Sequence, residues 1–550
     1  MVGKYEEEKL EPRILIEDKS KSYGDPNTEN MLIHGDNLLA LKALEDKYTG
    51  KVKCIYIDPP YNTGEAFDEY DDNVEHSIWL QLMKQRMEIL NKLLADDGTI
   101  FVQLNDEELC YCRVLMDEVF GRNNFINMIA VKTKNSSGAS GGGEDRKLKK
   151  NIEHILCYGK QDFKKFYPSY TTVELSQYLE DMKINGVSFK YTMVFTSLGR
   201  RKYYKTIKDG AGRDIIIYKH EGYETKSIRQ LAVEDEITEI EAFENYYDYV
   251  CTTENAQTSI RTRVREATDD LDNLYSIDYY PVSGRNKGKL TTVHFVGKNK
   301  RLVSWFKNVC VKERGHIFKK EKVGSLWEDL NWNNVNREGG VVFFRGGKKP
   351  EILIKRIMEL ATLPGDIILD SFLGSGTTMA VAHKMNRKWI GIEMGEHAYS
   401  LCKTRIDGVI DGEQGGISKE VNWQGGGGYK FYELAEPLLV KNKSLPVYQI
   451  NPSYTWDMVC EAICKIEGFT YEPSGEFQGH SSENRFIHIT EEFVNTKYVM
   501  SIMKNLGDKQ SLLIYCKKNQ ADMILPENVE VKKIPKDLLD KCNFESEVQE

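Results

Sequence analysis

Apolar and polar positions in the early part of the chain predict strands and helices in turn. Residues 31–36 predict a short strand and turn, and the apolar run 52–57 predicts a buried strand. The leucines of 38–49 recur at helical spacing, and residues 77–95 place apolar side chains on one face of a second helix. Residues 99–104 predict a further strand. Strands that alternate with helices are typical of a parallel α/β sheet with right-handed crossovers.

The same alternation returns after a long interruption. Residues 350–362 predict a helix, 366–369 a strand and 389–393 another strand, with a glycine-bearing turn at 374–376 and a helix between the two strands. The intervening residues 160–325 are rich in tyrosine, irregular and without steady alternation. We therefore expect a separate domain that is inserted between two halves of one sheet.

The two ends of the chain lie outside this sheet in the prediction. Residues 1–30 form a charged leader, and the glycine run 425–428 is expected to act as a hinge. Beyond it, apolar runs alternate with helical stretches, so residues 436–550 predict a small C-terminal α/β domain. The two halves of the main α/β domain are then 31–159 and 326–435.

Composition narrows the class of protein. The 550 residues are 40% hydrophobic and 29% charged, which is ordinary for a globular protein and excludes a fibrous or wholly disordered chain. Neither a signal peptide nor an apolar run long enough to span a membrane is expected. The expected location is the cytoplasm.

Charge is segregated along the sequence although the whole chain has a net charge of −9. Residues 231–280 carry 13 acidic and three basic side chains, whereas 281–320 carry 11 basic side chains and one acid. The basic block also contains aromatic residues, so it predicts contact with nucleic acid. Alternatively, the block is a solvated face, or the insertion joins two protomers through its acidic and basic stretches. The candidate DNA-binding residues are Arg285, Lys287, Lys289, Lys298, Lys300 and Arg301.

The tetrapeptide Asp58-Pro59-Pro60-Tyr61 directly follows a predicted parallel strand, at the edge where open α/β sheets bind ligands. The amine of a nucleobase is a poor nucleophile, so a catalyst must hold both of its hydrogens. The carboxylate of Asp58 can accept one hydrogen bond and the carbonyl of Pro59 the other. The paired prolines fix the backbone and so hold this carbonyl in place. Tyr61 can stack on the base, which must first be flipped out of the duplex. The alternative interpretation is a rigid turn.

A second cluster lies around Gly374-Ser375-Gly376, where a strand turns into a helix. The dinucleotide-binding pattern lacks its third glycine here, which favours close approach of the backbone to a nucleoside. Glu393 ends the next strand, where its carboxylate can accept both ribose hydroxyls of an adenosyl group. Either feature alone is also consistent with an ordinary tight turn and a solvated strand end.

These residues resemble the β-group amino-methyltransferases of DNA, which use S-adenosylmethionine and carry the catalytic tetrapeptide before the cofactor-binding motif. The closer resemblance is to modification (Mod) subunits of Type III restriction-modification systems. It rests on residues 58–64, on 34–38 upstream, and on Lys349-Pro350 ahead of 370–378. It implies an α/β, Rossmann-like S-adenosylmethionine-dependent methyltransferase fold with circularly permuted motif order, an inserted target-recognition domain and a small C-terminal α/β domain.

The resemblance also implies roles for individual residues. Asp58, Pro59, Pro60 and Tyr61 would be catalytic and act on N6 of adenine. The cofactor would be bound by Asp36, Asp58, Lys349, Pro350, Asp370, Phe372, Gly374, Ser375, Gly376, Thr377 and Glu393. The expected partners are double-stranded DNA, a second copy of the chain and a restriction (Res) subunit. Since the sulfonium of the cofactor supplies the electrophile, we expect no metal.

Three alternatives remain at this point. Cytosine-N4 methyltransferases resemble this pattern but tend to have Ser where Asp58 stands. Protein glutamine-N5 methyltransferases tend to have Asn there and would have little use for the basic block 281–320. A DNA-binding subunit that retains the fold without turnover is the alternative outside enzymes.

Overall fold

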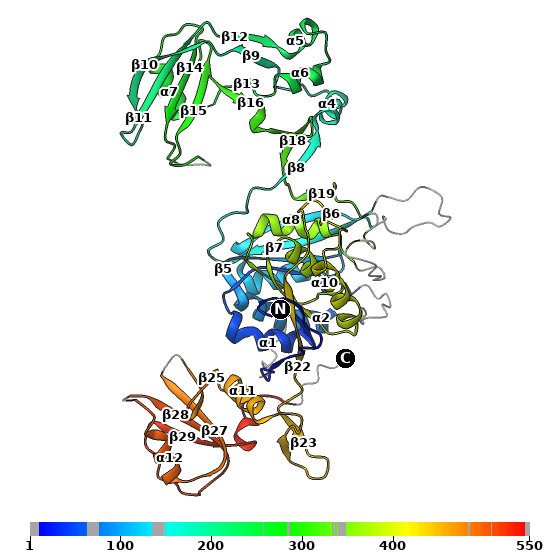
Figure 1. The fold of residues 1–550 in the computed structure, drawn as a ribbon, viewed down its shortest axis with the longest axis vertical. Coiled ribbons are helices and arrows are strands. Elements are labelled where there is room, and N and C mark those ends of the chain that lie inside the picture. The colour runs from blue at the N-terminus through cyan, green and yellow to red at the C-terminus, as the bar shows by residue number, and fades with distance from the viewer. Residues whose placement is uncertain are drawn as a thin grey trace, which may run out of the picture. The chain divides into compact units, whose positions relative to one another are not determined.

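The computed structural model describes residues 10–62, 76–134, 148, 150–256, 258–282, 286–332, 335, 338, 348–481, 484–507 and 509–544. The chain divides into two compact units (Figure 1). One unit comprises Met1–Tyr167 and Gly324–Glu550, and the other comprises Pro168–Val323. Residues 136–143, whose serine- and glycine-rich composition predicts a flexible loop, lie outside the described residues.

The first unit is built on a sheet of 11 described strands that draws on both halves of the sequence. Six neighbouring strands, from β22 to β5, are parallel, and β7 runs antiparallel between β5 and β6. The short strand β2 (Tyr23–Gly24) also pairs with β22. In spatial order the other strands are β1 (Leu15–Glu17), β22 (Gly428–Leu434), β3 (Met31–His34), β21 (Lys388–Glu393), β20 (Ile367–Asp370), β4 (Val52–Ile57), β5 (Leu94–Leu104), β7 (Ile152–Gly159), β6 (Phe125–Lys132) and β19 (Leu326–Trp327).

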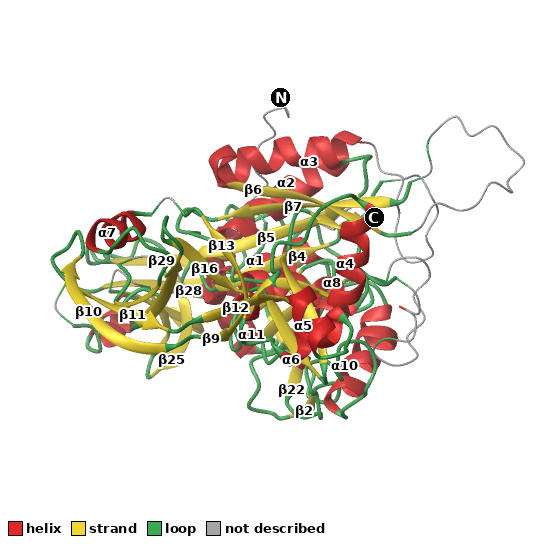
Figure 2. Ribbon diagram, turned by 90° about the horizontal axis from the view of Figure 1, so that it is seen from above, coloured by secondary structure: helices red, strands yellow, loops and turns green. Residues whose placement is uncertain are grey.

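Helices cover both faces of this sheet, with α2 and α3 on one side and α8 and α10 on the other (Figure 2). Apolar side chains of α1, α2 and α3 pack with those of β3, β4 and β5 in one buried cluster. Burial of apolar surface on both faces explains why the central strands are almost continuous apolar runs. The helices of this unit are α1 (Asn37–Tyr48), α2 (His76–Leu93), α3 (Leu109–Met116), α8 (Glu351–Ala361), α9 (Thr377–Lys384) and α10 (Lys403–Ile410).

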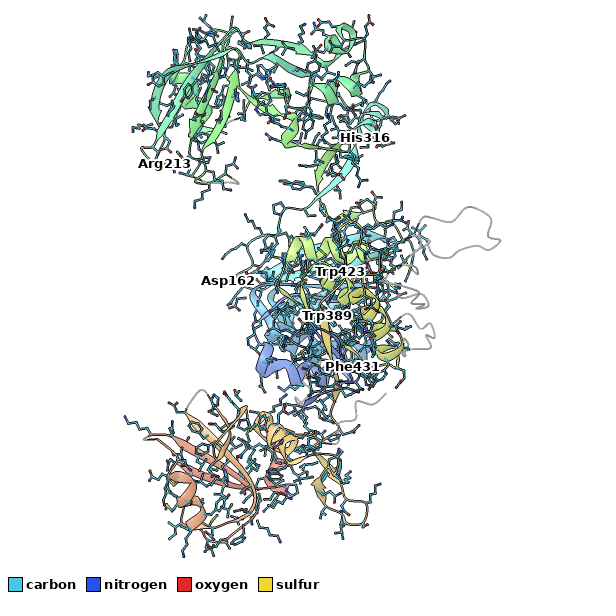
Figure 3. The ribbon with its side chains drawn as sticks, viewed as in Figure 1. Asp162, Arg213, His316, Trp389, Trp423 and Phe431 are labelled. Atoms are coloured by element: carbon cyan, nitrogen blue, oxygen red, sulfur yellow. The ribbon has the colours of Figure 1, made fainter. Side chains whose placement is uncertain are left out.

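The sheet also includes residues that the sequence had placed outside it. Part of the predicted leader forms β1, which pairs with β22 in register Ile16↔Glu433. The glycine run is not a hinge, because Gly428 opens β22, and β22 pairs in parallel with β3. Phe431 of β22 and Trp389 of β21 are both buried in this unit (Figure 3).

The C-terminal residues form a second, smaller sheet within the first unit. Strands β27, β28 and β29 are parallel, while β25, β26 and β27 are antiparallel. Two buried apolar clusters stabilise this sheet. Its elements are β25 (Thr470–Ser474), β26 (Phe477–His480), β27 (Arg485–Val494), β28 (Ser511–Asn519), β29 (Val529–Lys533), α11 (Trp456–Ile466) and α12 (Thr496–Met503), preceded by the hairpin of β23 (Leu439–Lys441) and β24 (Tyr448–Ile450).

The second unit is more regular than the sequence predicts. Its main sheet has eight antiparallel described strands, and a second sheet joins β17, β18 and β8. In spatial order the main sheet holds β10 (Arg200–Lys208), β11 (Asp214–Glu221), β14 (Leu274–Tyr279), β15 (Thr291–Val296), β16 (Arg301–Trp305), β13 (Val250–Glu254), β9 (Met193–Ser197) and β12 (Glu224–Ser227). The remaining elements are β8 (Tyr170–Glu174), β17 (Cys310–Glu313), β18 (His316–Lys322), α4 (Leu175–Ile184), α5 (Ile228–Glu234), α6 (Glu239–Asn245) and α7 (Ser259–Ala267).

Two features of this unit explain why its alternation was missed. Buried apolar side chains lie on both faces of the sheet, one of them covered by Val264 of α7, and strand β10 is exposed along almost its whole length. The predicted irregularity of 160–325 was therefore wrong. In the part of the chain that the structure describes, no helix has the length and apolar character needed to cross a membrane.

Candidate functional site

Direct pairing of β4 with β20 brings the two predicted motifs together. The two strands are parallel, with Leu369 opposite Ile55. Asp58 follows β4 and Asp370 ends β20, so both lie at the same edge of the sheet. Glu393 ends β21, the neighbour of β20.

A cavity of about 250 Å³ opens at this edge. Most of the predicted catalytic and cofactor-binding residues line it: Asp36, Asp58, Pro59, Pro60, Tyr61, Lys349, Asp370, Phe372, Gly374, Ser375, Thr377 and Glu393. Pro350 and Gly376 do not line the cavity. They directly precede α8 and α9, respectively.

Asp58 is held by a cation that the sequence assigned only to the cofactor. Nζ of Lys349 lies 2.8 Å from Oδ2 of Asp58. The other carboxylate oxygen, Oδ1, is buried and accepts no hydrogen bond from any described residue. Burial raises the pKa of the Asp58 carboxyl above its usual range, and the Lys349 ammonium limits that rise. The carboxylate thus offers one unpaired acceptor at the cavity.

Tyr61 belongs to a polar network that sequence reasoning missed. Its hydroxyl donates to Oε2 of Glu153 at 2.8 Å and accepts from Nζ of Lys349 at 2.9 Å. Gln103 also donates to Glu153, and Tyr56 donates to Gln103 at 2.7 Å. Burial is the largest single effect and disfavours the charge on Glu153, but the Lys349 ammonium and the hydrogen bonds from Gln103 and Tyr61 together outweigh it. The pKa of Glu153 therefore lies below its usual value. The network fixes the position of the Tyr61 ring beside Asp58.

The origin of these partners explains why they were missed. Glu153 comes from β7, which pairs antiparallel with β5, and no local motif marks it. Gln103 did carry a signal, because it is an amide within the apolar run at the end of β5, where it is fully buried. A buried polar side chain requires partners, so Gln103 predicted a polar neighbour even where the neighbour was unknown.

The glycine turn is shaped by Asp370. Its carboxylate accepts from the backbone N–H of Phe372 at 3.0 Å and from Oγ1 of Thr378 at 2.6 Å. Burial raises the pKa of Asp370 to about 7. Gly374 and Gly376 have φ angles of 55° and 75°, a region that disfavours residues with a Cβ atom. Asp370 therefore holds the turn from inside while also lining the cavity.

Glu393 contacts the same turn from the neighbouring strand. Its Oε2 accepts from the backbone N–H of Gly374 at 2.6 Å, and its Oε1 from that of Met394 at 2.9 Å. Nε2 of His397 lies 3.0 Å from Oε1. These contacts orient the carboxylate at the cavity.

Asp36 serves first as the N-cap of α1. Its Oδ1 accepts from the backbone N–H of Leu39 at 3.0 Å, and its Oδ2 lies 3.3 Å from Nη2 of Arg86. Asn37 donates to the carbonyl oxygen of Ser371 at 2.7 Å. The start of α1 is thereby tied to the turn that follows β20.

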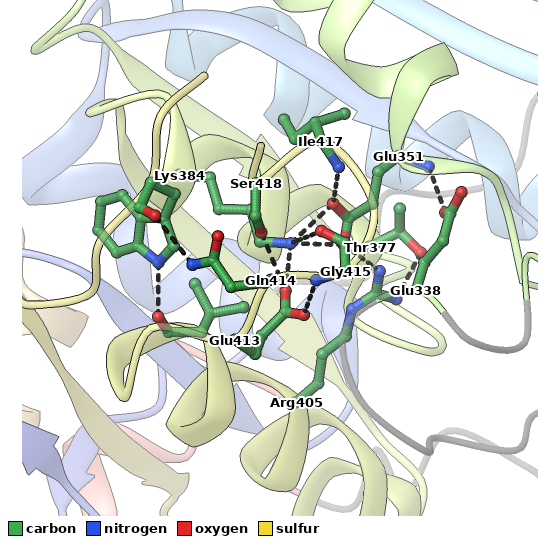
Figure 4. A network of polar contacts seen from close by, with 12 residues as sticks. Glu338, Glu351, Thr377, Lys384, Arg405, Glu413, Gln414, Gly415, Ile417 and Ser418 are labelled. Carbon is green, nitrogen blue, oxygen red and sulfur yellow. Dashed lines mark hydrogen bonds and ion pairs between the residues drawn. The ribbon is translucent and has the colours of Figure 1, made fainter. Parts of the chain in front are cut away.

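A buried ionic network reaches Thr377, the residue directly after the glycine turn (Figure 4). Glu351 of α8 lies 2.8 Å from both Lys384 and Arg405, and all three side chains are fully buried. Arg405 also donates to Oγ1 of Thr377 at 2.8 Å and to the carbonyl oxygen of Ser375 at 3.3 Å. The network links helices α8, α9 and α10 to the turn.

The predicted DNA-binding residues belong to the second unit and do not behave alike. Arg285 lies outside the described residues. The prediction that Lys300 binds DNA is wrong. The side chain is fully buried, and its ammonium donates to the carbonyl oxygens of Leu271 at 2.9 Å and Gly297 at 3.2 Å. A buried lysine with carbonyl partners is not available for a phosphate. Arg301 donates to Thr253 at 2.7 Å but remains exposed, as do Lys287, Lys289 and Lys298.

Comparisons with known proteins agree with the motifs. Residues 52–404 match the family described as DNA methylase. The probable type III restriction-modification enzyme HindVI Mod subunit of Haemophilus influenzae is 44% identical over 419 residues, which cover 76% of this chain and 55% of that protein. The EcoPI Mod subunit of Escherichia phage P1 is 25% identical over 421 residues, or 69% of this chain and 59% of that subunit.

The chain spans a little over half the length of these curated relatives. Among solved structures, an M1.HpyAVI–SAM complex matches with 13% sequence identity and a TM-score of 0.30, and the match covers 68% of this chain and 99% of that one. That similarity is too distant to place individual residues.

The buried network gives a stability prediction. Glu351→Ala leaves the charges of Lys384 and Arg405 buried without their shared carboxylate, which we expect to lower the free energy of unfolding by about 3–5 kcal/mol. Urea denaturation measures this loss. Glu530→Ala is the control, because Glu530 pairs with Arg485 at the surface and should cost less than about 1 kcal/mol. Equal midpoints for the two variants would contradict the stabilising role of the network.

Proposed function

Because the chain belongs to the DNA methylase family, we propose that it transfers a methyl group from S-adenosylmethionine to the exocyclic N6 of adenine in DNA. It would act as the modification subunit of a restriction-modification system, or as a solitary relative of such subunits. One observation carries the proposal. The buried Oδ1 of Asp58 has no hydrogen-bond partner among the described residues, and Asp58 lines a cavity together with residues of the glycine turn.

The chain's contribution to the reaction is orientation. Oδ1 of Asp58 accepts one N–H of the flipped adenine amine, and the carbonyl of Pro59 accepts the other. Tyr61, fixed by Glu153 and Lys349, stacks on the base. Holding both hydrogens directs the nitrogen lone pair toward the electrophile, and a cavity filled by base and cofactor would exclude competing water.

The opposite part of the cavity fits the cofactor. Glu393 would accept the ribose hydroxyls, Phe372 would contact the adenine ring, and the backbone of Gly374 would approach the nucleoside closely. When bound, S-adenosylmethionine supplies an electrophilic methyl group on its sulfonium. Asp370 and the buried network around Glu351 would affect cofactor binding indirectly, because they hold the glycine turn in its shape.

The proposal also covers the target base, the partners and the location. Asp at position 58 favours adenine over cytosine as the target base, and the substrate is double-stranded DNA. The similarity to Mod subunits supports a homodimer that associates with a restriction (Res) subunit, and an enzyme that modifies cellular DNA acts in the cytoplasm. The inserted unit would recognise the target sequence.

Loss of the Asp58 acceptor tests the chemistry. Asp58→Ala should reduce transfer of labelled methyl from cofactor to DNA more than tenfold, or about 1.4 kcal/mol on the barrier, while DNA binding survives. Mass spectrometry of the digested DNA should show N6-methyladenine and no N4-methylcytosine with the wild type. Asp97→Ala, an exposed change far from the cavity, is the control. Turnover by Asp58→Ala above a tenth of the wild-type rate would remove Asp58 from this role.

Lys349 should control the pH dependence. The Asp58 carboxyl accepts a hydrogen bond from the amine only when the carboxyl is ionised. The single-turnover rate should therefore fall as the pH drops through the pKa of Asp58. Burial raises that pKa and Lys349 opposes the rise, so Lys349→Met should move the midpoint of the pH profile to higher pH. Lys349→Arg keeps the positive charge and should keep the midpoint near that of the wild type. An unmoved profile in Lys349→Met would show that Lys349 does not tune Asp58.

Glu393 should control cofactor affinity. Glu393→Gln replaces a charged acceptor by a weaker one, and we expect the Kd for S-adenosylmethionine to rise about tenfold or more. Isothermal titration calorimetry measures it. Glu396→Gln, an exposed neighbour, should bind like the wild type. If Glu393→Gln bound S-adenosylmethionine with the same Kd as the wild type, Glu393 would not be the partner of the ribose hydroxyls.

A further inference from the structure

The β10–β11 hairpin of the second unit is an exposed, strongly basic edge. Strand β10 contains five Lys or Arg residues among nine and no acid. The whole hairpin, residues 200–221, carries seven basic and three acidic side chains. Every β10 residue except Ile207 is exposed, and β10 is the terminal strand of the eight-stranded sheet. The sequence prediction had passed over this segment in favour of 281–320.

Acidic neighbours neutralise these cations only weakly. Lys202 pairs with Glu221 at 2.5 Å and Lys208 with Asp214 at 2.7 Å, but each of these four side chains is 46% to 64% exposed. Ion pairs at such exposure contribute about 0–1 kcal/mol. Both lysines can therefore exchange a carboxylate for another anion at little cost.

Side-chain contacts hold several residues of the hairpin surface in fixed positions. Arg201 lies 3.7 Å from the ring centre of Tyr218 and pairs with Asp278 at 2.8 Å, which fixes one side of the hairpin. Tyr203 is 65% exposed and its hydroxyl lies 3.1 Å from Oγ1 of Thr206. Tyrosine hydroxyls and basic side chains are common donors to phosphate oxygens.

Part of the predicted basic block continues this surface. Asp278 pairs with Ile216 of β11 on one side and with Thr292 of β15 on the other. The loop from β14 to β15 therefore emerges at the same end of the sheet as the turn of the hairpin, where Arg213 lies (Figure 3). That loop carries the exposed Lys287 and Lys289.

We propose that the β10–β11 hairpin is the main surface by which the inserted unit binds the phosphates of duplex DNA. The inference rests on the proposed function and deepens it, because it names the element that contacts DNA. The nine residues of β10 extend roughly 30 Å, so their cations can contact successive phosphates along a duplex. Lys300, in contrast, is committed to the interior.

A second copy of the chain is the alternative partner for this surface, since an edge strand can pair with the same strand of another molecule. Charge argues against it. Two β10 strands side by side would bring ten cations together, and lysines on an edge strand are a common device that prevents such pairing. A polyanion instead gains from every cation, because each contact releases a counterion from the DNA.

The test removes charge from the hairpin of the full-length chain. Lys202, Lys205 and Lys208 are replaced together by Ala, and binding to a labelled duplex of about 30 base pairs is followed by fluorescence anisotropy across a salt series. We expect Kd to rise about tenfold or more and the slope of log Kd against log salt to fall by up to about 2.7. Replacement of the same residues by Arg should retain binding.

Matched controls separate the outcomes. The combined replacement of Lys183, Lys190 and Arg229 by Ala removes the same charge from exposed positions elsewhere in the unit and should change Kd less than threefold, or about 0.7 kcal/mol. Unchanged DNA affinity in the hairpin variant overturns the proposal, as does a changed oligomeric state in sedimentation without a change in affinity.

A parallel methyl-transfer assay keeps the two proposals distinguishable. Wild-type transfer to DNA together with normal binding by the hairpin variant rejects the hairpin alone. A wild-type chain that neither binds duplex nor transfers methyl overturns the proposed function and the hairpin together. Equal thermal unfolding of variant and wild type shows that lost affinity reflects lost contacts.

Discussion

The parallel pairing of β4 with β20 is the constraint on which the site depends. It places Asp58 and Asp370 at one sheet edge although more than 300 residues separate them. Parallel strands send their carboxyl ends to the same side, so whatever follows each strand meets there. The long inserted unit leaves this pairing intact because it leaves the sheet after β7 and returns at β19, on the far side of β5. A large insertion is tolerated where it interrupts no central strand.

The cavity combines buried charge with incomplete hydrogen bonding. Lys349 satisfies one oxygen of Asp58 and leaves the other without a partner among the described residues. An unsatisfied buried acceptor is costly in a folded protein, so its retention here points to a ligand that completes it. Glu153 balances the charge of Lys349 and holds Tyr61, which makes the four residues one electrostatic unit.

The glycine turn differs from Asp58 in that several of its groups are hydrogen-bonded to neighbouring side chains. Asp370 accepts from the turn itself, Glu393 accepts from Gly374, and Arg405 supports the turn through Thr377. Backbone placed this firmly can approach a ligand without the entropic cost of ordering a loop. The surface strand β10 differs again, because its lysines are exposed and the ion pairs of Lys202 and Lys208 are exchangeable.

The sequence by itself determined the local facts: the α/β alternation, the two motifs, and the residues Asp58 and Glu393 at the ends of their strands. Periodicity and turn chemistry are local, so they can be seen in a single chain. Only the tertiary structure decided that Lys349 contacts Asp58, that Glu153 joins the site, and that Lys300 is buried rather than free. Those facts depend on which distant strands are neighbours and which side of a sheet is covered. A run of basic residues has the same composition whether its side chains face solvent or the core, and packing alone decides between them.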